Sequence, residues 1–172
     1  MIRLDQLQQI MPHAGERAAV FLEALNAAMA EFSINTPLRQ AAFLAQIAHE
    51  SGSLRYVKEL ATGKAYENRQ DLGNVRAGDG PRFKGRGLIQ ITGRANYQKV
   101  GAALGIDCEN HPEVLELRTT ACLSAAWWWE SHGLNELADL GEFRKITRRI
   151  NGGYNGEAER LKLYQVALGV LR

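Results

Sequence analysis

The sequence predicts a mainly α-helical protein with a small β-hairpin, folded as one domain. Along most of the 172 residues, apolar side chains recur three and four positions apart, which is the spacing of one face of a helix. Hydrophobic residues make up 45% and charged residues 23%, which is typical of globular proteins and not of disordered ones. No stretch approaches the roughly 18 apolar residues of a spanning helix. We therefore expect residues 1–172 to form a single helical domain without stable membrane insertion.

Three helices are expected before residue 51. Apolar sets at helical spacing indicate the first two: Ile2, Leu4, Leu7 and Ile10, then Ala18, Phe21, Leu22, Leu25 and Ala28. For the third, Thr36 supplies an N-cap and Pro37 a first-turn proline, and Ser51-Gly52-Ser53 is a typical end. Because the third helix is apolar nearly all round, we expect it at the centre of the core.

The segment 51–93 breaks every helical pattern. Its interruptions are Gly52, Gly63, Gly73, Gly78, Gly80, Gly85 and Gly87, together with Pro81. This composition favours long loops and a small hairpin, which we expect to form the wall of a cleft. Helical spacing returns in five later stretches, at residues 95–104, 112–131, 134–140, 142–150 and 157–171.

Charge and cysteine usage exclude little by themselves. The formal net charge of +2 is compatible with an anionic polymer but does not demand a nucleic-acid partner. Four cations lie on neighbouring turns of one expected helix: Arg144, Lys145, Arg148 and Arg149. They favour a solvated face, with attraction to anionic polymer, phosphate or DNA as alternatives. Cys108 and Cys122 form no CxxC pair, so we expect free thiols.

Glu50 is the first candidate for chemistry, because it closes the apolar third helix. Burial and the negative end of the helix dipole both favour a protonated carboxyl, which is the form that a general acid needs. The alternative is a structural glutamate neutralised by Arg55 or by a backbone amide.

Glu59 is the second candidate, in the glycine-rich segment beside Lys58 and Arg55. Nearby cations favour its ionised form, so an acid and a base would face each other. Glycosidases use two such carboxyls, and a separation of roughly 6.5–9.5 Å leaves room for water and gives inversion. The alternative is a solvated loop charge.

Gln90 and Thr92 alternate in the short β-like run GLIQITG, so their side chains should project to the same side. There they could hold a water or a sugar hydroxyl, or else simply meet solvent as the polar face of a hairpin. Asn151 stands in an Asn-Gly-Gly turn, from which its amide could contact a sugar.

Metal and nucleotide sites are not expected. His49-Glu50 begins like the HExxH zinc motif, but Ser53 stands where the second histidine belongs. We therefore expect no metal or other cofactor, and a hydrogen bond from His49 to the neighbouring carboxyl. Gly85-x-Gly87 lacks the remaining residues of a nucleotide-binding loop. The consecutive residues Trp127–Trp129 point in different directions on a helix, which favours core packing over a flat sugar platform.

Four motifs occur together in one order: AHESG, the glutamate of VKELATGKAYENR, FKGRGLIQITGRANY and RRINGGYNGEAERLKLY. Jointly they resemble glycoside hydrolase family 19, and most closely its phage endolysin branch, which is similar to plant chitinases in the catalytic core. The resemblance runs from Leu38 to Tyr164. It implies a lysozyme-like, family 19 chitinase-type catalytic domain that hydrolyses β-1,4 linkages between amino sugars with inversion.

The resemblance also implies roles for individual residues. Glu50 falls on the general acid, Glu59 on the base that activates water, and Thr92 on the hydroxyl that helps to hold this water. The positions that bind substrate or link the carboxyls match Gln90, Asn96, Asn151 and Arg160, and His49 matches the histidine before the acid. Ala95 departs from the tyrosine of plant members, cysteines are few, and no wall- or chitin-binding module fits.

These departures lead us to expect a muramidase-type endolysin that cuts peptidoglycan between N-acetylmuramic acid and N-acetylglucosamine to lyse the host cell. Its partners would be peptidoglycan glycan strands and not nucleic acid, and we expect a monomer. With no signal peptide in the sequence, it would be made in the host bacterial cytoplasm and act on the periplasmic wall after release. The alternatives are a chitinase and a non-catalytic wall-binding module.

Overall fold

The computed structural model describes residues 1–172 and contains nine α-helices. Their bounds are α1 Leu4–Ile10, α2 Arg17–Glu31, α3 Pro37–Glu50, α4 Asp79–Arg82, α5 Arg94–Leu104, α6 Arg118–Ser131, α7 Leu134–Asp139, α8 Phe143–Asn151 and α9 Glu157–Leu171. Shorter 3-10 turns occur at Pro12–Ala14, Lys64–Tyr66, Gln70–Leu72 and Pro112–Glu116. No helix is long and apolar enough to cross a membrane.

Helix α3 lies at the centre of the core, as its composition predicts. Residues 41–48 are all buried, and α9 packs along this helix. The Thr36 hydroxyl accepts a hydrogen bond from the Arg39 backbone amide (3.2 Å), which caps the helix before Pro37. The Trp129 ring meets Phe43 edge-on, with ring centres 5.4 Å apart, so the core role expected for this tryptophan is confirmed.

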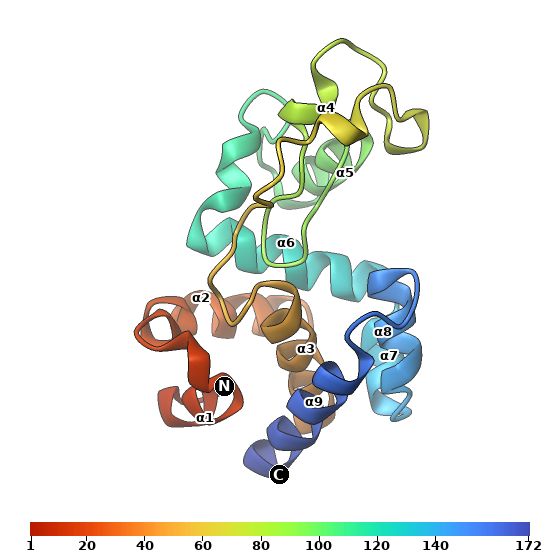
Figure 1. Ribbon diagram of the computed structural model, residues 1–172. Coiled ribbons are helices and arrows are strands. Elements are labelled where there is room, and N and C mark those ends of the chain that lie inside the picture. The colour runs from red at the N-terminus through yellow and green to blue at the C-terminus, as the bar shows by residue number, and fades with distance from the viewer.

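Two hydrophobic clusters meet at α6. The larger one joins α1, α2, α3, α6 and α9, and the smaller one lies around α5. Trp127 and Trp128, on α6, pack against both clusters. In Figure 1, α6 accordingly crosses the middle of the molecule, with α4 and α5 on one side and α1, α3 and α9 on the other. This helix therefore lies between the two clusters and contacts both.

The expected β-hairpin does not form as such. Antiparallel pairing is limited to isolated bridges of Arg86 with Lys58 and with Ile91. Between Arg86 and Ile91 the chain turns through two left-handed residues, Gly87 (φ +82°) and Gln90 (φ +60°), which ends the pairing after one rung. The turn is docked on α6 through Leu88, which is fully buried.

The helix expected over residues 112–131 is divided in two. Pro112–Glu116 forms a 3-10 turn, and α6 begins only at Arg118. Leu117 separates them because its backbone is extended (φ −69°, ψ 143°), which no helix tolerates.

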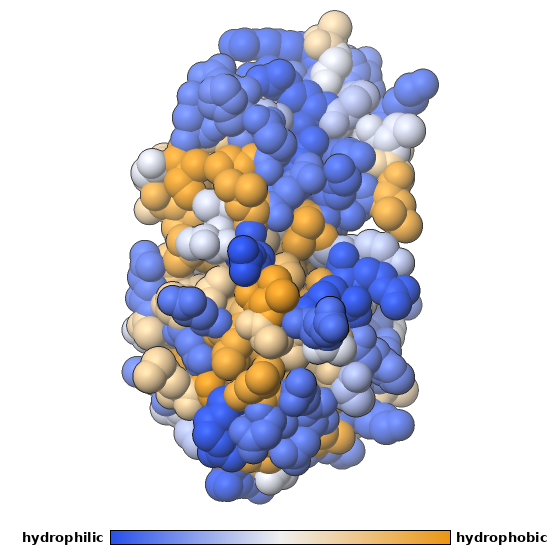
Figure 2. Space-filling model, turned by 90° about the vertical axis from the view of Figure 1, so that its left-hand side faces the viewer, coloured by the Kyte–Doolittle hydropathy of each residue, from blue (hydrophilic) through white to orange (hydrophobic).

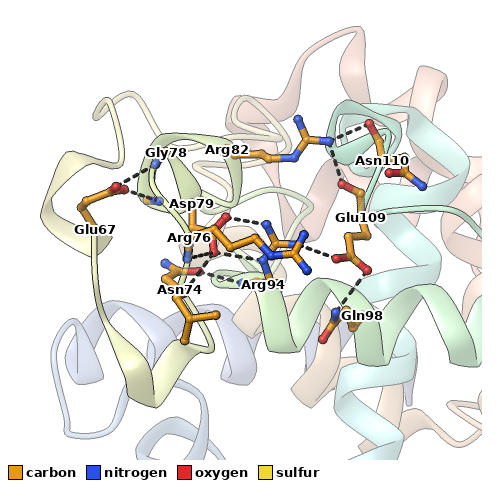
Figure 3. A network of polar contacts seen from close by, with 12 residues as sticks. Glu67, Asn74, Arg76, Gly78, Asp79, Arg82, Arg94, Gln98, Glu109 and Asn110 are labelled. Atoms are coloured by element: carbon orange, nitrogen blue, oxygen red, sulfur yellow. Dashed lines mark hydrogen bonds and ion pairs between the residues drawn. The ribbon is translucent and has the colours of Figure 1, made fainter.

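A buried polar network anchors the loop before α5 (Figure 3). Both carboxylate oxygens of Asp79 accept hydrogen bonds from the Arg94 guanidinium, at 2.6 and 2.9 Å. Asn74 accepts from the Arg94 backbone amide (2.9 Å) and donates to the Tyr66 carbonyl (2.8 Å). The Arg94 guanidinium lowers the pKa of Asp79 to about 2. The network fixes the position of Tyr66, which matters for the site below.

The face that carries α2 shows apolar surface across its middle and polar surface at both ends (Figure 2). Val20 and Leu117 are among its exposed large residues, and they line a shallow groove between α2 and the start of α6. The two cysteines, Cys108 and Cys122, are buried free thiols, which confirms the expectation. Burial raises their pKa values to about 11 and about 12.

Candidate active site

Glu50 ends α3 and is paired with a buried arginine from α9. Its Oε1 lies 2.6 Å from Nη2 of Arg160, and the two side chains are 19% and 1% exposed. The two groups form an ion pair, but their geometry does not meet the angles of a hydrogen bond. Arg160 is itself fixed, because it donates to the Gln46 side chain (2.5 Å) and to the Asn155 carbonyl (3.0 Å). The partner considered from the sequence alone, Arg55, makes no ion pair with Glu50.

This support extends into α8. Gln46 uses its amide nitrogen to donate to the Thr147 hydroxyl (2.9 Å), so α3, α8 and α9 share one buried polar network. Asn151 accepts a hydrogen bond from the Asn155 backbone amide (3.1 Å). Its side chain therefore holds the turn that carries the Asn155 carbonyl to Arg160.

His49 does not bond to Glu50, so that prediction is wrong. Its Nδ1 lies 2.5 Å from a carboxylate oxygen of Glu159, in the first turn of α9. The ring also packs against Gly156, where an added Cβ would lie 2.3 Å from the His49 Cε1 atom. The geometry makes His49 part of the contact between α3 and α9.

Glu59 is placed by backbone pairing and by one tyrosine. Its amide donates to the Gly85 carbonyl (2.9 Å), and its Oε2 accepts from the Tyr66 hydroxyl (2.9 Å). The other oxygen, Oε1, is buried and has no hydrogen-bond partner. Burial and this carboxylate together raise the pKa of Tyr66, so the hydroxyl keeps its proton and donates.

The cations that the sequence placed beside Glu59 lie elsewhere. Lys58 pairs with Glu116 at 3.2 Å, and Arg55 is exposed without an ion-pair partner. Neighbours in a strand-like segment project to opposite sides, which explains why Lys58 and Glu59 have different partners. The fixed contact of Glu59 is thus a neutral donor, Tyr66, and not a cation.

Gln90 and Thr92 do converge, although not as residues of a strand. An added Cβ on Gly85 would lie 2.6 Å from Gln90 Oε1, 3.0 Å from Glu59 Oε2 and 3.3 Å from Thr92 Oγ1. An amide, a carboxylate and a hydroxyl therefore gather closely around this glycine, where a side chain would not fit without displacing them. The Thr92 hydroxyl donates to the Gln90 carbonyl (3.1 Å), and Asn96 donates to the Thr92 carbonyl (2.8 Å).

The candidate residues thus form two groups joined by the segment 51–58. One group supports Glu50 and includes Arg160, Asn151 and His49, and the other surrounds Glu59. A carboxyl with one oxygen fixed by Tyr66 and the other without a partner is suited to hold and deprotonate a water molecule. No group of three or more His, Cys, Asp and Glu side chains is arranged to hold a metal ion.

Sequence reasoning missed the residues that fix the two carboxyls. Tyr66 lies in a glycine-rich loop, where no spacing links it to Glu59. Gln46 and Thr147 lie on buried helix faces. A polar residue on an apolar helix face indicates that it has a hydrogen-bond partner, but the sequence does not show which residue that is.

Comparison with known proteins places the chain in a family. The family model described as chitinase class I matches residues 25–137. A protein of Haemophilus influenzae is described as a glycosyl hydrolase family 19 domain-containing protein. It is 33% identical to this chain over an alignment of 199 positions, which spans 98% of this chain and 96% of the relative. The chain belongs to glycoside hydrolase family 19. It is therefore a glycoside hydrolase, as the motifs predict.

Other family 19 relatives come from plants and bacteria. An endochitinase of Arabidopsis thaliana is 35% identical over 113 residues, which are 66% of this chain but 39% of the plant protein. The crystal structure of a bacterial family 19 chitinase superposes with a TM-score of 0.82 at 27% identity, over 99% of this chain and 94% of the other. Chitinase C from Streptomyces griseus gives the same TM-score at 25% identity, over 99% and 76%. The mainly helical, family 19 chitinase-type fold is confirmed.

Proposed function

We propose that this family 19 enzyme is a peptidoglycan-degrading endolysin of the muramidase type. It would hydrolyse the β-1,4 bond between N-acetylmuramic acid and N-acetylglucosamine with inversion. The observation that carries the mechanism is the buried Oε1 of Glu59, which has no partner in the protein and would be satisfied by a water molecule. The other oxygen of the same carboxyl, Oε2, lies with Gln90 and Thr92 around Gly85.

In the proposed reaction, Glu50 donates its proton to the glycosidic oxygen and the bond to the leaving sugar breaks. Glu59 removes a proton from a water held by Thr92, and the resulting hydroxide attacks the sugar from the opposite face. One displacement inverts the anomeric centre. Arg160 lies against Glu50 and would stabilise the carboxylate that remains once the proton has left. Gln90, Asn96 and Asn151 would position the sugar.

The choice of peptidoglycan is supported by the first turn of α5. Ala95 stands where plant members carry a tyrosine, and it packs closely on the preceding loop. An added Cβ on Gly73 would lie 2.7 Å from the Ala95 Cβ. The first turn of α5 therefore lacks the aromatic side chain that plant members carry at this position. We further propose that residues 1–172 work as one catalytic domain and a monomer, on the periplasmic wall after release from the host cytoplasm.

The test is mass spectrometry of purified Gram-negative peptidoglycan digested by the wild type and by Glu50→Gln, with new reducing ends chemically reduced. Fragments ending in reduced N-acetylmuramic acid, absent with the variant, are the expected result. Reduced N-acetylglucosamine ends would overturn the bond assignment. Equal products from both proteins would overturn the role of Glu50.

A chitinase is the second candidate, because the plant and Streptomyces relatives are described as chitinases. It predicts cleavage of soluble N-acetylglucosamine oligomers together with no glycan cleavage of peptidoglycan. If neither substrate is cleaved, a non-catalytic wall-binding module becomes the better explanation.

A further inference from the structure

A cationic concavity lies on the outer side of α8, and neither Glu50 nor Glu59 lines it. We call it the basic pocket, and it is lined by Arg144, Lys145, Arg148, Arg149 and Tyr154, with Glu142 and Gly152 at its edge. The same helix buries Phe143, Ile146 and Thr147 on its inner side. The cations are therefore gathered on one face by helical spacing, and the turn after α8 folds Tyr154 over them.

Two of the four cations are already neutralised within the protein. Arg144 pairs with Glu157 (2.5 Å) and stacks on the Tyr154 ring at 3.9 Å, and Lys145 pairs with Glu142 (3.0 Å). These contacts shape the pocket but leave little charge for a ligand.

The other two cations keep their charge available. Arg149 donates to the His132 backbone carbonyl (2.7 Å), a contact that orients its guanidinium without neutralising it. Arg148 is exposed and makes no ion pair. Neighbouring guanidinium groups of this kind recognise carboxylate or phosphate groups, since each can donate two parallel hydrogen bonds.

The pocket shares a short turn with the support of Glu50. Tyr154 lines the pocket, and the next residue, Asn155, gives its carbonyl to Arg160, which contacts Glu50. The basic pocket is therefore connected to Glu50 through this turn and Arg160. Peptidoglycan differs from chitin in carrying peptide stems with free carboxylates along the strand.

We infer that the basic pocket binds carboxylates of the peptide stems and so favours peptide-substituted, anionic strands over neutral ones. This inference rests on the proposed function. The competing explanation is a solvated helix face, which would contribute only the general charge of the molecule.

The test compares Arg148→Gln/Arg149→Gln with a matched double variant, Lys99→Gln/Arg118→Gln, which removes the same charge from exposed positions on α5 and α6. Each is made in the wild type and in the Glu50→Gln background. The Glu50→Gln proteins are sedimented with native sacculi and with sacculi whose carboxylates have been amidated, at low and high salt. The active proteins are assayed for kcat/KM on sacculi and on N-acetylglucosamine oligomers.

The pocket variant should lose about tenfold in binding to native sacculi at low salt, and the matched variant much less. Amidation of the sacculi, or high salt, should bring the wild type down to the level of the pocket variant. In the assay, the ratio of kcat/KM on sacculi to that on oligomers should fall for the pocket variant alone.

Equal loss in the two double variants, or binding that amidation leaves unchanged, would overturn the inference. Failure of the proposed function would give a different result, since the wild type would then leave the glycan of sacculi uncut. The sedimentation comparison would still measure whether the basic pocket binds the carboxylates of the sacculi.

Discussion

At the scale of single side chains, the two oxygens of Glu59 have different surroundings. Oε2 accepts the Tyr66 hydroxyl, whereas Oε1 is buried and unpaired. A carboxylate held by one oxygen presents the other in a fixed direction, which is what a base acting on one water molecule requires. In the proposed mechanism Tyr66 is therefore a positioning residue, since it would act through Glu59.

Tyr66→Phe should lower kcat about tenfold with little change in KM, because it removes a hydrogen bond to a charged group worth about 1.5 kcal/mol. Steady-state kinetics on a soluble oligomer measure both constants. Tyr164→Phe is the control, since it removes a tyrosine hydroxyl from the α9 core, where the ring stacks on Phe143. A kcat within twofold of the wild type for Tyr66→Phe would contradict the positioning role.

At the scale of elements, the turn of residues 85–92 gathers the polar atoms of the site. Gly85 has no side chain, and an added Cβ would fall among Gln90, Glu59 and Thr92. The nearest of these atoms is the end of a flexible side chain, which can move aside at small cost to folding. Substitution here should therefore separate activity from stability.

Gly85→Ala should reduce kcat about a hundredfold, because displacing a base or its water by about 1 Å has an effect of that size. The thermal midpoint should change little. Gly169→Ala, in α9 with open space around it, is a matched control that should keep kcat and gain slight stability. If Gly85→Ala keeps full activity, then the polar side chains gathered around this glycine do not position the base and its water.

The loop held by Asp79 and Arg94 gives a prediction about pH. The pKa of Asp79 is about 2 in the folded protein, below its ordinary value of 3.8, so folding favours the carboxylate. Its contribution of about 2 kcal/mol is complete above pH 4 and is lost as the pH falls through about 2. Urea unfolding of the wild type and Asp79→Asn between pH 6 and 2 should show a stability difference that shrinks towards acid.

The control for this loop is Asp71→Asn, which breaks the exposed pair with Arg69. It should change the free energy of unfolding by well under 1 kcal/mol. A constant difference between the wild type and Asp79→Asn over the whole pH range would contradict the role of Asp79.

How far the sequence predicts these elements depends on where each signal lies. Helix α3 follows from its N-cap at Thr36 and its local spacing, and most later helices follow from spacing alone. The short α4 and the division of residues 112–131 could not be predicted in this way. The break in the expected hairpin could not be predicted, because Gln90 adopts a left-handed backbone conformation that glutamine rarely adopts. Glu50 and Glu59 were identified by motif, but their partners Arg160 and Tyr66 come from tertiary contacts that no local pattern encodes.

At the scale of the whole molecule, α6 joins the two hydrophobic clusters. Trp127 and Trp128 pack on both clusters, while Trp129 is fully buried beside Phe43. The region that carries Glu59 is therefore not independent of the region that carries Glu50. The two sides of the site should persist or unfold together.

Urea unfolding followed by tryptophan fluorescence and by far-ultraviolet circular dichroism should give coincident transitions. Leu88→Ala, which weakens the docking of the 85–92 turn on α6, should lower both midpoints equally, with a loss of about 2–4 kcal/mol. A fluorescence change that precedes the loss of helix would mean that the two clusters unfold separately.

The two faces of α8 are subject to different structural constraints, and this affects how the enzyme can evolve. The inner face holds Gln46 through Thr147 and so helps to support Glu50, whereas the outer face carries the cations in solvent. Outer residues can change one at a time without disturbing the inner ones. Under the proposed role of the basic pocket, preference for differently charged glycans could therefore change by single substitutions that leave the support of Glu50 intact.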